Sequence, residues 1–216
     1  MEEAKAVLCR PLQDLARLAF SDHEIYPTFY KRTEAGLHIP GGSEWDNLRS
    51  AADTILFGDT NKKHVRFAAL SVDGLGVERY GECSITLKTD FIAHRTSLLE
   101  ENSVGFMKNH SVGAANDYRI PPGYRAPWQM RARLAVAKLA DSISKKTRPA
   151  DFPTLVLSEG SDGWTDKFIE LQIWGSFTIR TVAGVRIRHW IDRPPKSAIR
   201  ALSDRLENLK IALELP

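Results

Sequence analysis

The segment DKFIELQIWG, residues 166–175, places a carboxylate and an amide between large aromatic rings. Its alternation of apolar and polar residues predicts a strand. One face of that strand would carry Ile169, Leu171 and Ile173, and the other would carry Phe168, Glu170, Gln172 and Trp174. A carboxylate that lies against aromatic rings loses hydration, so its charge is costly unless it has a partner or a chemical role. Glu170 is therefore a candidate catalytic residue, and the alternative is an exposed glutamate whose neighbours cover a second small core.

Arg66 lies within KKHVRFAALSV, residues 62–72, which has the pattern of an apolar strand. Alternation places His64, Arg66 and Ala68 on one face of that strand and Val65 and Phe67 on the other. The planar guanidinium of arginine suits the binding of phosphate. Arg66 is therefore a candidate anion-binding residue, although most arginines simply extend into solvent.

A third polar group lies in HRTSLLEENS, residues 94–103, where Arg95 precedes Thr96 and Ser97. The simplest interpretation is the start of a helix, with Thr96 or Ser97 as the N-cap and an acidic residue in the first turn. That local role leaves Arg95 or Ser97 free to face a ligand as well.

The net charge of +3 is unevenly distributed along the chain. Residues 118–148 hold eight Lys or Arg and one acidic residue, residues 179–200 hold six and one, and residues 1–60 hold ten acidic residues against six basic ones. The first basic segment interleaves aromatic residues with Arg119, Arg125, Arg131 and Arg133. This composition indicates a surface for nucleic acid, and the alternative is that the basic faces pair with the acidic N-terminal part.

Several strong motifs are absent from the sequence: it contains no phosphate-binding loop, dinucleotide fingerprint, nucleophile elbow or zinc-protease motif. The six histidines are scattered and the two cysteines, Cys9 and Cys83, are far apart, so we expect neither a metal site nor a disulfide. No apolar run is long enough to span a membrane, and the N-terminus lacks a signal-peptide pattern. A reducing cytoplasmic compartment is the expectation.

The elements that must position these residues follow from periodicity and turn signals. We predict helices at 3–19, with a possible break at Pro11, at 43–57 with Ser43 as N-cap, at 128–146 and at 196–213. We predict strands at 64–72, 80–87 and 152–160, and two more around a turn at residues 175–176. The type of the run at 103–107 stays open.

This order of elements predicts an α+β fold with a mixed, mostly antiparallel sheet flanked by helices. We expect a single domain over residues 1–216. It would comprise a helical N-terminal part (1–60), a sheet core with one long helix (61–193) and a C-terminal helix (194–216). The apolar stripe of that last helix, from Ile199 to Leu213, is typical of ordinary core but would also suit a protein partner.

Taken together, the polar segments resemble the ADP-ribosyltransferase-like fold. Members carry an Arg or His on an early strand, a polar Ser/Thr segment in the middle and a Glu that opens a late strand. The matching residues here are His64 or Arg66, then the segment Arg95–Ser97, then Glu170. The stretch HVRFAALSVDGLGVERYGECSITLK also resembles abortive-infection proteins and DNA-modifying toxins of this superfamily. The chain departs from the family at Phe168, where a Glu or Gln would complete the common pair, and this argues against transfer to a protein arginine.

The resemblance implies that NAD is the substrate and that no metal takes part. Glu170 would stabilise the positive charge that develops on the ribose as nicotinamide leaves, with Ser97 in support. Arg66 or Arg95 would hold the pyrophosphate, His64 would be a further cofactor-binding residue, and Tyr80 or Trp174 would stack on nicotinamide. The acceptor would be nucleic acid or protein, in a toxin or phage-defence setting.

Two other functions stay open at this stage. One is a non-enzymatic nucleic-acid-binding module that uses the basic segments 118–148 and 179–200. The other is a protein-interaction module that uses the C-terminal helix.

Overall fold

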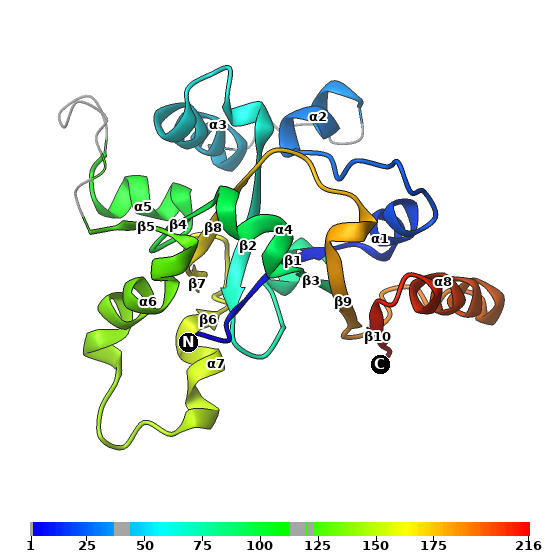
Figure 1. Cartoon of the computed structure of the whole chain (residues 1–216). Helices are drawn as coiled ribbons and strands as arrows, with labels where there is room; N and C mark the ends of the chain where they lie inside the picture. Colours follow the sequence, from blue (N-terminus) through cyan, green and yellow to red (C-terminus); the bar gives the residue numbers. More distant parts are fainter. Residues whose placement is uncertain (1, 37–43, 113–119, 121–122) are drawn as a thin grey trace.

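The computed structural model describes residues 2–36, 44–112, 120 and 123–216, and an eight-stranded sheet runs through this part of the chain (Figure 1). Across the sheet the strands are ordered β10 (Ala212–Glu214), β9 (Val182–Ile187), β3 (Cys83–Leu87), β1 (Lys5–Arg10), β2 (Val65–Ser71), β8 (Glu170–Trp174), β4 (Thr96–Leu99) and β5 (Arg125–Pro127). All neighbours are antiparallel except β10 and β9, which are parallel. Two short strands, β6 (Leu157–Ser158) and β7 (Lys167–Phe168), pair separately. The predicted α+β domain with a mixed, mostly antiparallel sheet is confirmed.

The described α-helices are distributed around this sheet: α1 (Leu12–Ala19), α2 (Phe29–Glu34), α3 (Glu44–Phe57), α4 (Thr89–Ile92), α5 (Ser103–Asn109), α6 (Arg131–Leu139), α7 (Phe152–Val156) and α8 (Lys196–Asn208). Figure 1 shows α8 beside β9 and β10 at one end of the sheet, and α5 and α6 beside β4 and β5 at the other. None of the described helices combines the length and the apolar character that crossing a bilayer requires.

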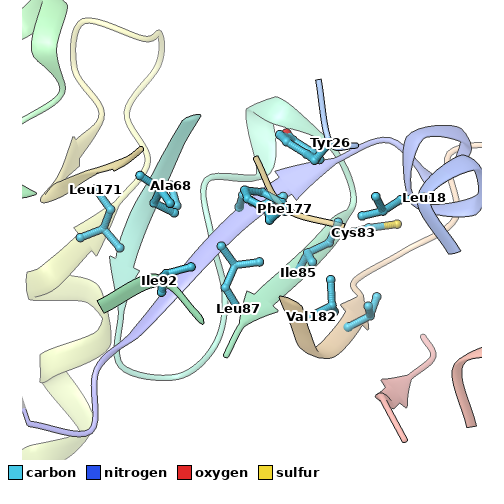
Figure 2. Close-up of a cluster of buried hydrophobic side chains, with 14 of the residues drawn as sticks. Leu18, Tyr26, Ala68, Cys83, Ile85, Leu87, Ile92, Leu171, Phe177 and Val182 are labelled. Carbon is cyan, nitrogen blue, oxygen red and sulfur yellow. The ribbon is translucent and has the colours of Figure 1, made fainter. Parts of the chain in front are cut away.

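One face of the sheet forms the main core. Ile169, Leu171 and Ile173 are fully buried there, as the alternation of their segment predicts. Helices α1, α6 and α8 contribute Leu18, Leu134 and Leu206 to the same cluster of buried residues. Figure 2 shows part of this core, where Tyr26 stacks on Phe177 with 4.8 Å between ring centroids. The apolar stripe of α8 is therefore core.

The opposite face of the sheet is covered by α3, α5 and the segments around residues 77–80 and 157–168. Leu99 of β4 packs here with Phe106 of α5, and Ile55 of α3 lies against them. Closer to the centre of the sheet, Ala69 packs with Val77 and Phe168. Glu170 lies on this second face, because its cross-strand neighbours are Ala69 and Leu99.

The predicted helix at 3–19 is wrong in its first half, because residues 5–10 form β1, a central strand, and the helix α1 begins only after Pro11. Strand β1 lies between β2 and β3 and is buried on both faces. A strand with two buried faces has a continuous apolar run instead of an alternating one, so periodicity does not identify it. The predicted helix at 43–57 is confirmed as α3, with Gly58 beyond its end at φ 76°, and its predicted N-cap, Ser43, lies outside the described residues.

Four further element predictions need correction. Residues 96–99 form strand β4 and not the start of a helix. The next helix, α5, begins later, with Asn102 as its N-cap, whose side chain accepts a hydrogen bond from the Val104 amide. Residues 152–156 form α7, with proline in its first turn, a position proline favours. Strands β8 and β9 are separated in the sheet and do not form a hairpin. Helix α8 ends at Asn208, and the chain then turns into β10.

Candidate functional site

Glu170 is the first residue of β8 and is 6% exposed. Its Oε2 accepts hydrogen bonds from the backbone amide and the hydroxyl of Ser103, both at 3.2 Å, and its Oε1 accepts one from Gln172 Nε2 at 3.2 Å. Burial raises the pKa of Glu170 to about 7, and the negative charge of Asp53 adds to this rise, while the hydrogen bonds from Gln172 and Ser103 act against it. The carboxylate is therefore oriented from two sides and changes charge near neutral pH.

Ser97 reaches Glu170 through Gln172. Gln172 is fully buried, and its Oε1 accepts hydrogen bonds from Ser97 Oγ at 3.2 Å and from Arg125 Nη2 at 3.1 Å. These two donors fix which end of the amide points away from the carboxylate. The structure thus brings predicted residues Ser97 and Glu170 into one hydrogen-bonded network, and it adds Arg125, which sequence analysis placed on a nucleic-acid surface.

Glu170 also lines a cavity on the second face of the sheet, together with Arg49, Tyr80, Ser103 and Phe168. The cavity has a volume of ≈ 60 Å³, enough for a few water molecules or a small polar group. It is smaller than the roughly 300 Å³ of pockets that enclose a drug-sized ligand. Burial raises the pKa of Tyr80, and the negative charge of Glu170 contributes to the same rise.

Arg49 is a cavity guanidinium whose charge acts on Glu170, and sequence analysis did not single it out. It extends from α3 over two aromatic rings, 5.0 Å from the ring centroid of Phe29 and 5.1 Å from that of Phe67. Its positive charge opposes the rise in pKa of both Glu170 and Asp53. Asp53 lies one turn further along α3, which is the spacing of an arginine–carboxylate pair on one helix face. That spacing is the signal that could have identified Arg49.

Asp53 is a second buried carboxylate near the cavity. It is fully buried and its Oδ2 accepts a hydrogen bond from Tyr30 Oη at 2.8 Å. Burial is the largest cause of its raised pKa. Because Asp53 also raises the pKa of Glu170, the two acids compete for the same positive charge on Arg49.

Arg66 and Arg95 do not line the cavity, which corrects the expectation that one of them would meet Glu170 there. Arg66 points into the main core, where it donates hydrogen bonds to the carbonyl oxygens of Tyr26 at 2.7 Å and Gly175 at 2.8 Å, and burial lowers its pKa to about 10. Arg95 donates to the carbonyl oxygens of Phe91 and Trp174. Both guanidiniums are bonded to main-chain carbonyl oxygens, and neither has a contact with the Glu170 carboxylate among the described hydrogen bonds.

Of the remaining predicted cofactor-binding residues, one lines the cavity and two do not. Tyr80 lines the cavity with Glu170. His64 is exposed and does not line it. Trp174 lies at the far end of β8, 36% exposed, with its ring at 5.6 Å from that of Phe57 in an edge-on contact. Of the two aromatic residues predicted to stack on nicotinamide, only Tyr80 is close to the carboxylate.

The basic residues predicted to bind nucleic acid do not form one free surface among the described residues. Arg125 bonds to Gln172, Arg131 lies over the ring of Trp128 at 4.8 Å, Arg133 is exposed, and Arg119 lies outside the described residues. In the segment 179–200, Arg188 pairs with Glu78 at 2.8 Å. Arg186 pairs with Glu214. Two of the basic side chains in this segment are therefore paired with acidic side chains.

The site as a whole combines a buried carboxylate that titrates near neutrality with a guanidinium and a phenol around one cavity. Such a set can bind a polar ligand, stabilise a developing positive charge or exchange a proton. No protein-family model matches the sequence, and the search of curated proteins found no match.

Proposed function

We propose that the protein is an NAD-consuming enzyme of the ADP-ribosyltransferase type and that Glu170 is its catalytic carboxylate. The observation that carries this proposal is the position of Glu170: it is buried in a cavity, held by Ser103 and Gln172, and near the positive charge of Arg49. In this reaction the bond between nicotinamide and the ribose breaks, and positive charge develops on the ribose. A fixed, ionised carboxylate stabilises that charge without having to reorganise.

The roles of the neighbouring residues follow from what they contact. Arg49 takes the part first expected of Arg66 or Arg95, because of the two arginines that line the cavity, Arg10 and Arg49, it is the one whose charge opposes the raised pKa of Glu170. Tyr80 offers a flat ring beside the carboxylate. Gln172 is a positioning residue that keeps Glu170 oriented and connects it with Ser97.

The size of the cavity sets a condition on substrate binding. A volume of ≈ 60 Å³ does not enclose a dinucleotide, so the lining side chains must move when NAD binds. Arg49 is suited to move, because its contacts with Phe29 and Phe67 are of the cation–π type, worth about 0.5–1 kcal/mol each at an exposed site. We therefore expect Arg49 to leave these rings for the pyrophosphate as the substrate enters.

The proposed biological setting is a toxin or phage-defence effector that modifies nucleic acid or protein. A nucleic-acid acceptor would meet the exposed Arg133, whereas the ion pairs of Arg186 and Arg188 leave less positive charge for it. Nicotinamide is therefore the simplest product to measure, because its release does not depend on the identity of the acceptor.

The test is nicotinamide release from NAD by wild-type protein and by Glu170→Gln. We expect Glu170→Gln to lower the rate about 10²–10³-fold, as the loss of a preorganised electrostatic contact in other enzymes does. The matched control is Glu207→Gln on the exposed side of α8, which should keep the wild-type rate. Equal rates for Glu170→Gln and wild type would remove Glu170 from catalysis.

A further inference from the structure

Glu100, Glu101 and His110 form a compact group of side chains outside the cavity. The two glutamates follow β4, and α5 then returns the chain so that His110, just beyond its last residue, faces them. His110 Nε2 lies 3.3 Å from Glu100 Oε1 and 3.9 Å from Glu101 Oε1, and one ligand atom from each residue lies within 4.8 Å of the others. All three side chains are partly buried, which limits competition from water.

We infer that Glu100, Glu101 and His110 bind a divalent transition-metal ion. The separations of their atoms support this inference. A hydrogen bond between nitrogen and oxygen usually spans about 2.7–3.2 Å, and both distances from His110 Nε2 are longer. In a tetrahedral zinc site with bonds of about 2.0–2.1 Å, neighbouring ligand atoms are roughly 3.3 Å apart. The 3.3 Å between His110 Nε2 and Glu100 Oε1 thus equals such an edge, and the 3.9 Å to Glu101 Oε1 is short enough for one ion to contact both atoms.

The surroundings hold two of the three ligands in place. The His110 ring packs against Phe106 and Tyr124, at 4.3 Å and 4.4 Å between centroids. Glu101 Oε2 accepts a hydrogen bond from Asn109 Nδ2 at 2.9 Å, so its other oxygen is oriented toward His110. Such outer contacts orient metal ligands and contribute to affinity.

The donor set indicates the class of ion. One imidazole nitrogen with two carboxylates suits Zn²⁺, Mn²⁺ or Co²⁺ better than Mg²⁺ or Ca²⁺, which prefer oxygen alone. Three protein ligands leave a further coordination position open to water.

Metal binding at this group would brace two segments of the cavity network. Glu101 is followed directly by Asn102 and Ser103, and Ser103 donates to Glu170. Tyr124, which packs on His110, is followed by Arg125, which donates to Gln172. The ion is therefore expected to stabilise the fold, and this expectation does not depend on NAD chemistry.

The experiment uses the full chain, stripped with a chelator and titrated with Co²⁺, with the visible absorption of the bound ion as the readout. We expect one equivalent to bind, and His110→Ala or Glu101→Gln to weaken the affinity by at least about 10-fold. His94→Ala, at an exposed histidine, is the matched control and should bind as wild type does. Because Glu101→Gln keeps the shape of the side chain, it carries the test if His110→Ala fails to fold.

A second readout is thermal stability with Zn²⁺. At about 100 times Kd the ion should raise the Tm of the wild type by about 5–10 °C, and it should raise the Tm of Glu101→Gln much less. No Co²⁺ spectrum at millimolar metal, or equal affinity in wild type and both ligand variants, would overturn the inference. The group would then be an ion pair between His110 and the two carboxylates.

Discussion

Gln172 Nε2 donates a hydrogen bond to Glu170 Oε1 across 3.2 Å, and this contact joins the cavity to the edge of the sheet. The amide oxygen of Gln172 accepts from Ser97 on β4 and from Arg125 on β5. Because both donors meet the oxygen, the amide nitrogen must face the carboxylate. The alternation of Glu170 and Gln172 along β8 thus has a structural role. Residues of β4 and β5 fix the orientation of the Gln172 amide, and this amide in turn fixes the orientation of the Glu170 carboxylate.

Replacing Gln172 with methionine tests this network. The variant has similar volume but removes the donor to Glu170 and the acceptor for Ser97 and Arg125. We expect the free energy of unfolding to fall by about 1–3 kcal/mol, the cost of leaving buried polar groups without partners. Urea unfolding measures this change. Gln129→Met, at an exposed position, serves as the control, and an equal effect in both variants would contradict the role of Gln172.

The pKa of Glu170 predicts how stability depends on pH. Its pKa of about 7 in the folded protein lies above the usual 4.5 of a glutamate, so the folded state binds the proton more tightly than the unfolded state. The sign follows: Glu170 makes the protein less stable as pH rises from about 4.5 to 7, and the loss is complete above 7. Glu170→Gln abolishes this dependence.

We therefore expect the difference in free energy of unfolding between Glu170→Gln and wild type to grow in favour of the variant between about pH 4 and pH 8. The growth should reach up to about 3 kcal/mol, because each pH unit that separates the folded-state pKa from the unfolded-state pKa is worth ~1.4 kcal/mol. Urea unfolding at a series of pH values measures it, with Glu207→Gln as the control. A difference that stays constant over this range would show that Glu170 titrates at an ordinary pKa.

Arg66 shows which part of the site could not be predicted from the sequence. Alternation correctly divided the two faces of β8, whereas His64, which it grouped with Arg66 and Ala68, lies before β2. Alternation did not reveal how the two strands are aligned. The register pairs Arg66 with Ile173 and Ala69 with Glu170, so Arg66 and Glu170 point to opposite faces. A shift of one residue exchanges the faces of a strand, and only contacts distant in sequence determine the register.

The role of Arg66 is testable by the variant Arg66→Met. It removes the donors to the carbonyl oxygens of Tyr26 and Gly175, and we expect the free energy of unfolding to fall by about 2–6 kcal/mol, at ~1–3 kcal/mol for each buried group left without a partner. Urea unfolding measures it, with the exposed Arg200→Met as control. The KM for NAD of the folded variant should equal that of the wild type. If the variant instead raised the KM for NAD without loss of stability, Arg66 would be a substrate-binding residue and not a structural one.

Other elements were predictable where local signals marked them. Helix α3 and strand β2 lie within their predicted ranges because their patterns and the glycine after α3 are local signals. Strand β1 is not predictable in this way because both of its faces are buried. The polar run at 94–103 has the residue types of a helix start, although the true N-cap, Asn102, lies near its end. When several possible N-cap residues lie close together, the sequence does not show which one begins the helix. The pairing of the preceding residues with distant strands determines it.

Arg49 gives the sharpest test that links the cavity to NAD. If its guanidinium binds the pyrophosphate, Arg49→Met should raise the KM for NAD about 10–100-fold, equivalent to a charge-assisted contact of ~1.5–3 kcal/mol. Removing its positive charge should also raise the pKa of Glu170, so the rise of activity with pH should move to higher pH. Nicotinamide release at several NAD concentrations and pH values measures both effects.

The control for Arg49 is Arg133→Met, which removes an exposed guanidinium from the basic segment 118–148. It should leave both the KM and the pH profile unchanged, because no phosphate of NAD would meet it. If Arg49→Met shifts the pH profile while the KM stays at the wild-type value, Arg49 acts on Glu170 through its charge alone. The pyrophosphate would then have to bind elsewhere on the cavity rim, and the proposed movement of Arg49 would be wrong.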